Sequence, residues 1–120
     1  MRLLIVDDVQ DYLNSLCRAL RGDYEVVKAG SLSEAKEKMD GSVKLALVDI
    51  RLSEEDSANR DGLIFLGWLK ERFPSVPVVM MSAYRDFDAA ADALNLGAVH
   101  FLKKPINLKE LREVIGTLTK

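Results

Sequence analysis

The segment LALVD, residues 45–49, is an apolar run that ends in a carboxylate. Three further runs have the same form: LLIVDD at 3–8, VVMMS at 78–82 and VHFLKKP at 99–105. Short apolar runs that end in polar residues are typical of strands buried on both faces of a parallel sheet. The carboxyl ends of such strands lie at one edge, where open α/β sheets place their sites. We therefore expect carboxylates, a hydroxyl and a lysine to meet at this edge.

Helical patterns follow the strand-like runs, and the two alternate five times along the chain. This alternation predicts an α/β domain in which helices cover both faces of a parallel sheet. Ser31 and Glu34 form a capping box at the start of the second helix, and Gly97 suits a left-handed cap after the fourth. The expected strands are 2–6, 24–29, 44–49, 77–81 and 99–102, and the expected helices are 9–21, about 31–41, 61–73, 85–96 and 107–118.

Apolar spacing within the helices predicts which side chains are buried. The first helix buries Cys17 among leucines, and the single cysteine cannot form an internal disulfide. The third and fifth helices are expected to bury the following apolar residues: Leu63, Leu66 and Leu69 in the third, and Leu108, Leu111, Ile115 and Leu118 in the fifth.

The length and net charge of the chain limit the kinds of function that we expect of it. The chain has 120 residues, which is the size of one domain, so we expect residues 1–120 to form a single domain. A net charge of −2 argues against nucleic-acid binding, which needs a basic face. No charged-then-apolar leader is present and no apolar run approaches about 18 residues, so we expect a soluble protein without a membrane contact. The lone cysteine is consistent with the cytoplasm.

The expected charges at the sheet edge predict a cation site. Asp7, Asp8 and Asp49 would repel one another, because unit charges 4 Å apart interact by about 4 kcal/mol at an effective dielectric near 20. Mg²⁺ prefers such oxygen ligands together with water and phosphate oxygens. Lys104 would add a fixed positive charge. Single aspartates could instead cap helices or pair with Lys104, but all four positions together favour a site for a divalent cation and a phosphoryl group.

The order of these motifs resembles the receiver domain of two-component response regulators, in the CheY-like superfamily. The resemblance covers essentially the whole chain and implies a flavodoxin-like, doubly wound (βα)5 fold with strand order 2-1-3-4-5. It is carried by LIVDD at 4–8, LVDIRL at 47–52, DGL at 61–63, MSA at 81–83, GA at 97–98 and FLKKP at 101–105.

The resemblance implies that Asp49 is the phosphoacceptor, taking a phosphoryl group from a phosphohistidine in a Mg²⁺-dependent reaction. Asp8 would ligate Mg²⁺ directly and Asp7 directly or through water. Asp49 and the backbone carbonyl of Arg51 would complete the protein ligands. Lys104 rather than Lys103 would contact the phosphoryl oxygens, because the family lysine immediately precedes a proline. The domain would then catalyse only its own phosphorylation and dephosphorylation, and would not be an enzyme acting on other substrates.

Other positions would carry the response to phosphorylation. Ser82 would hydrogen-bond the phosphoryl group, with the small Ala83 beside it, and Phe101 would rotate as the switch. Arg51 and Tyr84 would flank the phosphoryl group and shield it from water. The family lysine–proline bond is cis, which proline permits at low cost.

Partners also follow only from the resemblance. They are a sensor histidine kinase or a histidine phosphotransfer protein, and a homodimer could form through the fourth helix, fifth strand and fifth helix. The stretch 82–105 is most similar to receivers of enhancer-binding transcription factors.

The chain departs from the family pattern in the segment 50–60. Asp61 lies twelve residues after Asp49, an insertion of about five residues. The acidic residues of this loop, at 54–56, could add ligands, repel a partner or be solvated. Ile64 and Trp68 fall where the family usually has polar residues, which suggests an exposed apolar pair covered by the loop or by a second molecule.

Three other functions fit the sequence less well than a phosphorylated receiver does. A haloacid-dehalogenase-like phosphohydrolase would need a second aspartate where this chain has Arg51. A flavin- or nucleotide-binding module would need a loop rich in glycine, serine and threonine after the first strand, where this chain has DDVQD at 7–11, with three aspartates that repel phosphate. A degenerate receiver that binds a partner without phosphorylation is supported only by the long loop.

Overall fold

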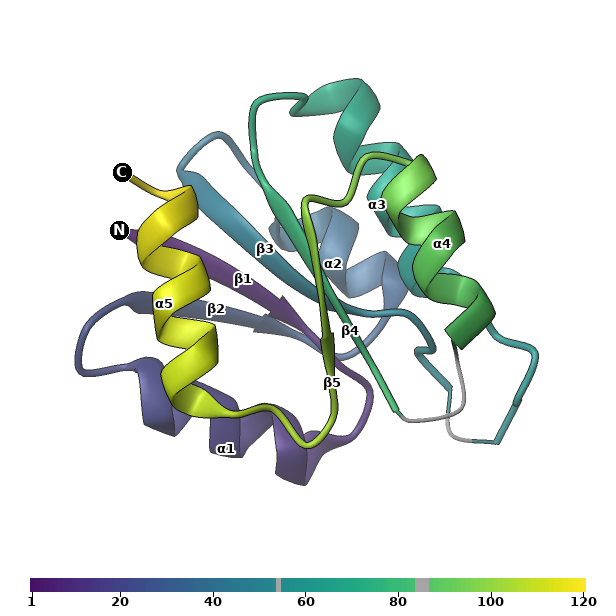
Figure 1. Cartoon of the computed structure of the whole chain (residues 1–120), viewed down its shortest axis with the longest axis horizontal. Coiled ribbons are helices and arrows are strands. Elements are labelled where there is room, and N and C mark those ends of the chain that lie inside the picture. Colours follow the sequence, from purple (N-terminus) through teal and green to yellow (C-terminus); the bar gives the residue numbers. More distant parts are fainter. Residues whose placement is uncertain (54, 84–86) are drawn as a thin grey trace.

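The sheet has the predicted topology. The computed structural model describes residues 1–53, 55–83 and 87–120. Within these residues, five parallel strands pair in the order β2-β1-β3-β4-β5 (Figure 1). Apolar runs 3–6 and 45–48 form the centre of the sheet, where burial on both faces excludes polar residues. The strands are β1 (Arg2–Val6), β2 (Glu25–Ala29), β3 (Val43–Asp49), β4 (Val78–Ser82) and β5 (His100–Lys103).

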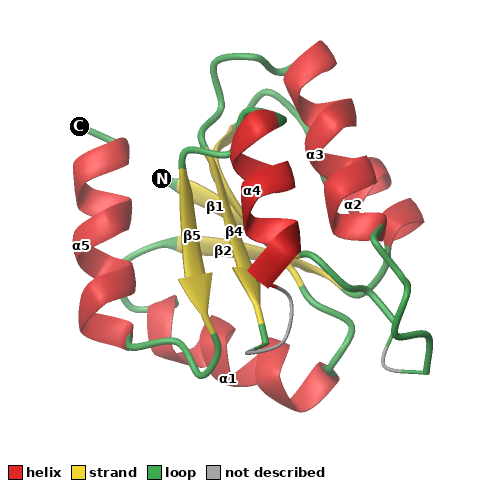
Figure 2. Ribbon diagram, turned by 45° about the vertical axis from the view of Figure 1, so that its right-hand side comes forward, coloured by secondary structure: helices red, strands yellow, loops and turns green. Residues whose placement is uncertain are grey.

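Helices cover both faces of the sheet, as Figures 1 and 2 show. On one face lie α1 (Gln10–Leu20) and α5 (Leu108–Leu118); on the other lie α2 (Leu32–Lys38), α3 (Asp61–Arg72) and α4 (Phe87–Asn95). The predicted boundaries hold to within one or two residues, except at α2, which ends earlier than expected. The predicted start of the fourth helix, residue 85, lies outside the described residues. The flavodoxin-like arrangement implied by the resemblance is therefore confirmed.

The local signals for helix ends behave as expected. Ser31 accepts a hydrogen bond from the backbone N–H of Glu34, which caps α2. Gly97 has φ of +106°, and the backbone N–H groups of Gly97 and Ala98 donate to the carbonyls of Leu94 and Ala93. This pair of hydrogen bonds is a Schellman cap, which satisfies carbonyls that α4 leaves free.

Two apolar clusters, one on each face, hold the layers together. Cys17 is buried in the α1–α5 cluster, as predicted. Leu111 and Ile115 of α5 enter the same cluster, but Leu108 is 41% exposed, so its predicted burial was wrong. Leu108 lies in the first turn of α5, ahead of the point where the helix reaches the sheet face.

The buried stripe of α3 differs from the expected one. It consists of Gly62, Phe65, Leu66 and Leu69, whereas Leu63 is only half-buried. The spacing 62, 65, 66, 69 is that of a core-facing helix stripe, with a glycine as its first member. Gly62 therefore rotates the helix so that Phe65 points inward, which apolar spacing alone did not reveal.

Trp68 is not part of an exposed apolar pair. It is half-buried, stacks on Phe65 with ring centroids 5.6 Å apart, and lies 6.1 Å from the ring of Phe73. The guanidinium of Arg72 covers it at 5.0 Å. Ile64 is 54% exposed, as expected.

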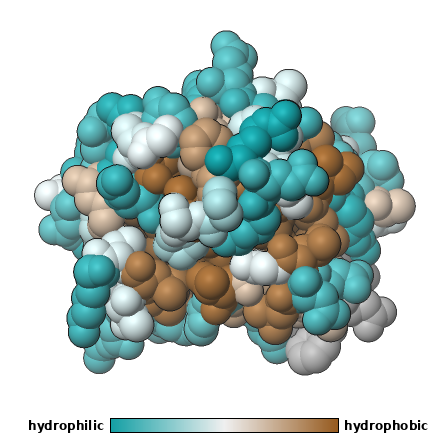
Figure 3. Space-filling view, turned by 90° about the horizontal axis from the view of Figure 1, so that it is seen from above, coloured by the Kyte–Doolittle hydropathy of each residue, from teal (hydrophilic) through white to brown (hydrophobic). Residues whose placement is uncertain are grey.

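The outer surface is mixed in character. On the face in Figure 3, hydrophilic side chains are interspersed with apolar ones. The described large apolar residues that are most exposed are Met1, Ile64, Leu94, Leu96, Val99 and Leu108. In the described ranges, no helix combines the length and apolar character needed to cross a bilayer.

Candidate functional site

The predicted site residues meet at the carboxyl edge of the sheet. Val6 pairs with Val48, which places Asp7 and Asp49 beside each other at the ends of β1 and β3. Ser82 pairs with Lys103 at the ends of β4 and β5, so Lys104 follows at the same edge. Parallel pairing thus brings together groups that are far apart in the sequence.

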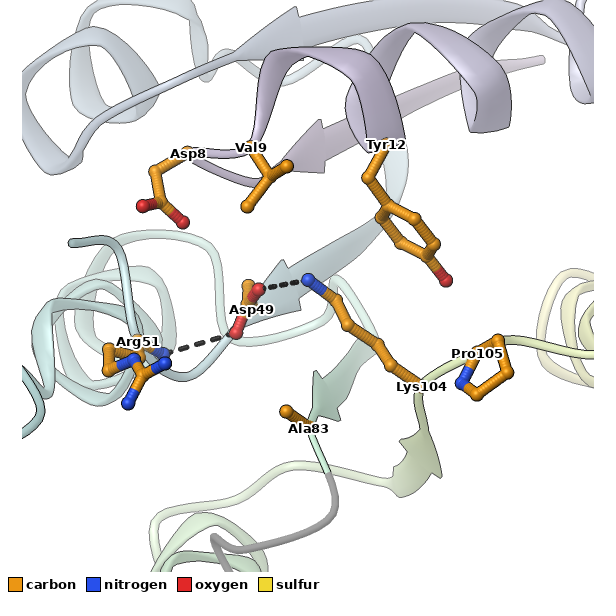
Figure 4. Close-up of a pocket in the computed structure, with 8 residues that line it drawn as sticks. All are labelled: Asp8, Val9, Tyr12, Asp49, Arg51, Ala83, Lys104 and Pro105. Carbon is orange, nitrogen blue, oxygen red and sulfur yellow. Dashed lines mark hydrogen bonds and ion pairs between the residues drawn. The ribbon is translucent and has the colours of Figure 1, made fainter. Parts of the chain in front are cut away.

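Lys104 links two buried carboxylates. Its Nζ lies 2.7 Å from Asp7 Oδ2 and 2.5 Å from Asp49 Oδ2. The second oxygen of each carboxylate accepts a backbone hydrogen bond: Asp7 Oδ1 from Val9 N at 2.9 Å, and Asp49 Oδ1 from Arg51 N at 3.1 Å. Figure 4 shows the contacts of Asp49 with Lys104 and with the Arg51 N–H. Asp7 is fully buried and Asp49 is 6% exposed. Each carboxylate is therefore held in place by an ammonium on one side and a backbone N–H on the other.

Burial dominates the acid–base behaviour of Asp49. Loss of solvent raises its pKa to about 6, and Asp7 adds to this, while Lys104 and the Arg51 N–H oppose the rise. Burial also disfavours the charged form of Lys104, but attraction to Asp49 and Asp7 outweighs it, so the pKa of Lys104 is raised. The lysine is accordingly a permanent cation, and Asp49 becomes fully ionised only above pH 6.

Acidic oxygens cluster closely enough to share a cation. One carboxylate oxygen from each of Asp7, Asp8 and Asp49 lies within 4.8 Å of the others. Asp8 is half-buried and lines the pocket with Asp49. The donors are all hard oxygens, which suit Mg²⁺ better than a softer metal.

A pocket of about 380 Å³ opens over these groups (Figure 4). Its lining consists of Asp8, Val9, Tyr12, Asp49, Arg51, Ala83, Lys104 and Pro105. Of the predicted residues, Asp8, Asp49, Arg51, Ala83 and Lys104 therefore face one space. That space can hold a small tetrahedral group between an ammonium and the carboxylates.

Tyr12 belongs to the site but was not predicted from the sequence. Lys104 Nζ lies 4.5 Å from the centre of its ring, a distance suited to a cation–π interaction. Its hydroxyl accepts a hydrogen bond of 3.1 Å from the backbone N–H of Ile106, and burial raises its pKa. The available signal was its position one helical turn after Asp8, on the side of α1 that faces the sheet edge.

The proposed switch residues lie near the site in different environments. Ser82 is buried, and its hydroxyl donates to the carbonyl of Ala83 at 3.0 Å. Phe101 is half-buried and packs against the cluster on the α3–α4 face. Tyr84 lies outside the described residues. The peptide bond between Lys104 and Pro105 is cis, in agreement with the resemblance.

Gly62 fixes the distance between α3 and β3, the strand that ends at Asp49. Its backbone N–H donates to the carbonyl of Ile50 at 2.9 Å. A Cβ at this position would come within 1.9 Å of the carbonyl oxygen of Asp49 and 2.7 Å of Ile50 Cα. Only glycine allows this approach, which explains the Asp61–Gly62 pair that opens α3.

The long loop, residues 50–60, is buried near its start and exposed farther along. Leu52 is buried, whereas Glu55 and Asp56 are exposed, and Glu54 is outside the described residues. Asp56 Oδ1 accepts from the N–H of Ala58 at 3.0 Å. The exposure of Glu55 and Asp56 agrees with a solvated tip.

Comparisons with known proteins agree with this geometry. A sequence model described as the response regulator receiver domain matches residues 3–116. The response regulator protein PilR of Pseudomonas aeruginosa is 36% identical over 97% of this chain and 25% of its own length. The transcriptional regulatory protein ZraR of Klebsiella oxytoca is 38% identical over 92% of this chain and 24% of its own length. The chain thus spans about a quarter of the length of these relatives.

A solved structure shares the whole fold. The receiver domain of NtrX from Brucella abortus superposes with a TM-score of 0.85 at 29% sequence identity. The match covers 98% of this chain and 97% of that one. The arrangement of strands and helices is therefore a shared architecture.

Proposed function

This chain belongs to the response regulator receiver domain family, and on that premise we propose that Asp49 accepts a phosphoryl group from a phosphohistidine of a partner protein. The P–N bond of the phosphohistidine breaks, a P–O bond to Asp49 forms, and the imidazole leaves with a proton. Asp49 suits this role because it lines the pocket and its two oxygens are oriented by Lys104 and the Arg51 N–H. Positioning and charge neutralisation carry most of the catalysis in such transfers.

The acidic cluster is proposed to hold Mg²⁺. Asp8 and Asp49 would ligate the ion directly, Asp7 directly or through water, and the backbone carbonyl of Arg51 would complete the protein ligands. Bound there, Mg²⁺ would neutralise charge on the phosphoryl oxygens. The ligand oxygens within 4.8 Å of one another support this assignment.

Lys104 is proposed to bind the phosphoryl oxygens. Its raised pKa keeps it charged, and its ion pairs hold the ammonium at the pocket wall. The ring of Tyr12, whose centre lies 4.5 Å from Nζ, also contacts this ammonium. Lys104 would exchange part of its contact with Asp49 for the incoming phosphoryl group.

Phosphorylation would be sensed at the ends of β4 and β5. Ser82 would give up its bond to the Ala83 carbonyl and donate to the phosphoryl group. Phe101 would then rotate, and the surface formed by α4, β5 and α5 would change. We further propose that Arg51 and Tyr84 shield the acyl phosphate from water.

The chain is the receiver domain of a two-component response regulator, and receivers of this kind interact with histidine kinases. We propose a sensor histidine kinase or a histidine phosphotransfer protein as the donor, and the cytoplasm as the location. The names of the relatives favour control of transcription as the output. A homodimer through α4, β5 and α5 is a further proposal, as is the assignment of residues 1–120 to one domain.

One observation carries the proposed function: Lys104 bridges the buried carboxylates of Asp7 and Asp49 at the wall of an acidic pocket. The test is phosphorylation of the purified chain by a small phosphodonor with and without Mg²⁺, read by intact-mass spectrometry. Addition of one phosphoryl group to wild type and to Asp56→Asn, but not to Asp49→Asn, is expected. Asp56 is the matched control because it is an exposed aspartate of the neighbouring loop.

Beryllofluoride, an acyl-phosphate mimic, tests the switch. With Mg²⁺ it should shift the amide NMR signals of Ser82, Phe101 and α4 in wild type but not in Asp49→Asn. A folded wild type that neither takes up the phosphoryl group nor responds to beryllofluoride would contradict the proposal and favour a phosphorylation-independent binding module.

A further inference from the structure

One side-chain oxygen closes the base of the long loop. Asn59 Oδ1 accepts a hydrogen bond from the backbone N–H of Leu52 at 2.9 Å and another from the backbone N–H of Asp61 at 2.9 Å. Leu52 follows the phosphoacceptor strand, and Asp61 begins α3. The Asn59 side-chain amide therefore holds the two ends of the loop, Leu52 and Asp61, close together.

The bond to Leu52 fixes a second group, the carbonyl of Arg51. The Leu52 N–H and the Arg51 carbonyl belong to the same peptide unit. In the described residues the cis bond is Lys104–Pro105, so this unit is trans. In a trans peptide the N–H and C=O groups point in opposite directions within one plane. Asn59 therefore holds the Arg51 carbonyl pointing away from the loop.

The other side of Arg51 is fixed by the site itself. Its N–H donates to Asp49 Oδ1 at 3.1 Å, and the residue lines the pocket with Asp8 and Asp49. The two peptide units that flank Arg51 are thus each held by a hydrogen bond, one to Asp49 in the acidic cluster and one to Asn59 in the loop. With both planes held, the carbonyl has little freedom to turn.

The hydrogen bond from the Asp61 N–H to Asn59 restrains the segment after β3 from its other end, where α3 begins. It holds the first residue of the helix, and the next residue, Gly62, donates to the Ile50 carbonyl at 2.9 Å. Asn59 consequently ties the segment that follows β3 to the first residue of α3, and Asp49 is the last residue of β3, just before this restrained segment. A loop lengthened by about five residues would otherwise leave that exit free to move.

We propose that Asn59 is a positioning residue for the metal site: its side-chain oxygen holds the Leu52 N–H so that the Arg51 carbonyl faces the acidic pocket. The extended loop thus contains the residue that holds its two ends together, so the inserted residues do not loosen the segment after β3. The inference rests on the proposed function in assigning Mg²⁺ and the Arg51 carbonyl to the site. It concerns metal binding and can be tested without phosphoryl transfer.

The test compares three variants by titrating the metal-free chain with Mg²⁺ and following amide NMR shifts. Asn59→Ala removes the acceptor and should weaken Mg²⁺ binding about tenfold, the lower end of the usual effect of supporting residues on metal affinity. Asn59→Asp keeps an acceptor oxygen and should bind Mg²⁺ within about threefold of wild type. Asp56→Ala, the matched control, removes a side-chain-to-backbone bond from the same loop and should also stay within about threefold.

Hydrogen exchange supplies a second readout that does not need the Asn59→Ala variant to fold. In wild type, the amides of Leu52 and Asp61 should be protected and those of the exposed tip should not. In Asn59→Asp both should stay protected. Rapid exchange of Leu52 in folded wild type would overturn the proposal, as would unchanged Mg²⁺ affinity in a folded Asn59→Ala variant.

The outcomes separate this inference from the proposed function. If wild type binds Mg²⁺ and Asn59→Ala binds it weakly, the positioning role holds even when Asp49 takes up no phosphoryl group. If Asp49 is phosphorylated normally and Asn59→Ala binds Mg²⁺ like wild type, the positioning role fails while the proposed function stands. If folded wild type binds no Mg²⁺, both fail.

Discussion

Gly62 packs directly against the backbone of Asp49, so close that a Cβ would come within 1.9 Å of the Asp49 carbonyl oxygen. The contact sets the position of α3 against β3, the strand that ends at the proposed phosphoacceptor. Gly67 offers a matched comparison in the same helix, because a Cβ there would meet nothing within 4 Å.

Gly62→Ala should therefore destabilise the fold by about 3 kcal/mol or more, as overpacking against backbone that cannot move aside does. Gly67→Ala should raise stability by about 0.5 to 1 kcal/mol, because alanine favours the helix. Urea unfolding followed by circular dichroism measures both. Equal stability of the two variants would show that α3 is free to shift away from β3.

Lys104 should be required for stability as well as for function. Lys104→Met would leave Asp7 and Asp49 buried without their cation, and we expect a loss of about 3 to 5 kcal/mol in the free energy of unfolding at pH 8. Lys103→Met, at the exposed neighbour, should change it by less than about 0.5 kcal/mol. If the two variants unfold at the same urea concentration, the ion pairs are not what holds these carboxylates.

Asp49→Asn should stabilise the protein at alkaline pH. The pKa of Asp49 is raised to about 6 in the fold, above its ordinary value, so keeping it ionised costs stability above pH 6, and this cost disappears as the pH falls below 6. We expect a gain of about 1 to 2 kcal/mol at pH 8 that is absent near pH 4. Thermal unfolding across this range, with Asp56→Asn as control, checks it. A gain independent of pH would rule out ionisation as its cause.

Mg²⁺ affinity should depend on pH through the same group. The ion needs ionised carboxylates, so the dissociation constant should rise about tenfold for each pH unit below 6 and level off above it. Calorimetric titration in buffers of different ionisation enthalpy would also detect the released proton. Binding that is constant from pH 5 to 8 would mean that Asp49 is not a ligand.

Trp68 should contribute to the core of the α3 face. Trp68→Ala removes the stacking on Phe65 and the contact with Phe73, and we expect a loss of about 2 to 3 kcal/mol, below the cost for a fully buried tryptophan. Ile64→Ala, at its exposed neighbour, should cost less than about 0.5 kcal/mol. Trp68 fluorescence in a variant with a shortened 50–60 loop, at several protein concentrations, tests whether the loop or a second molecule also covers the ring.

The strands and the site edge were predictable because their signals are local. Each buried run is apolar and ends abruptly at a charged or hydroxyl residue, and pairing in a parallel sheet then places those ends together. The same holds for the cap at Gly97, where the required positive φ selects glycine. Asp7, Asp49 and Lys104 could be placed together before any coordinates were available.

The remaining features depend on contacts between distant segments. Apolar spacing selected Leu63 as a core residue of α3. Gly62 instead packs against Asp49, and in that orientation of the helix Phe65 is buried. Tyr12 joins the site because α1 passes beside Lys104, and Asn59 acts through two backbone groups in a loop without periodicity. Asn59 carries no local signal of its role, and the signal of Tyr12 is limited to its position one helical turn after Asp8.

The ion pair between Asp7 and Lys104 joins residues separated by 97 positions in the chain. During synthesis the acidic residues leave the ribosome first, and the lysine that balances them arrives only after β5 has been made. A nascent chain therefore cannot assemble the pocket until almost the whole domain has emerged.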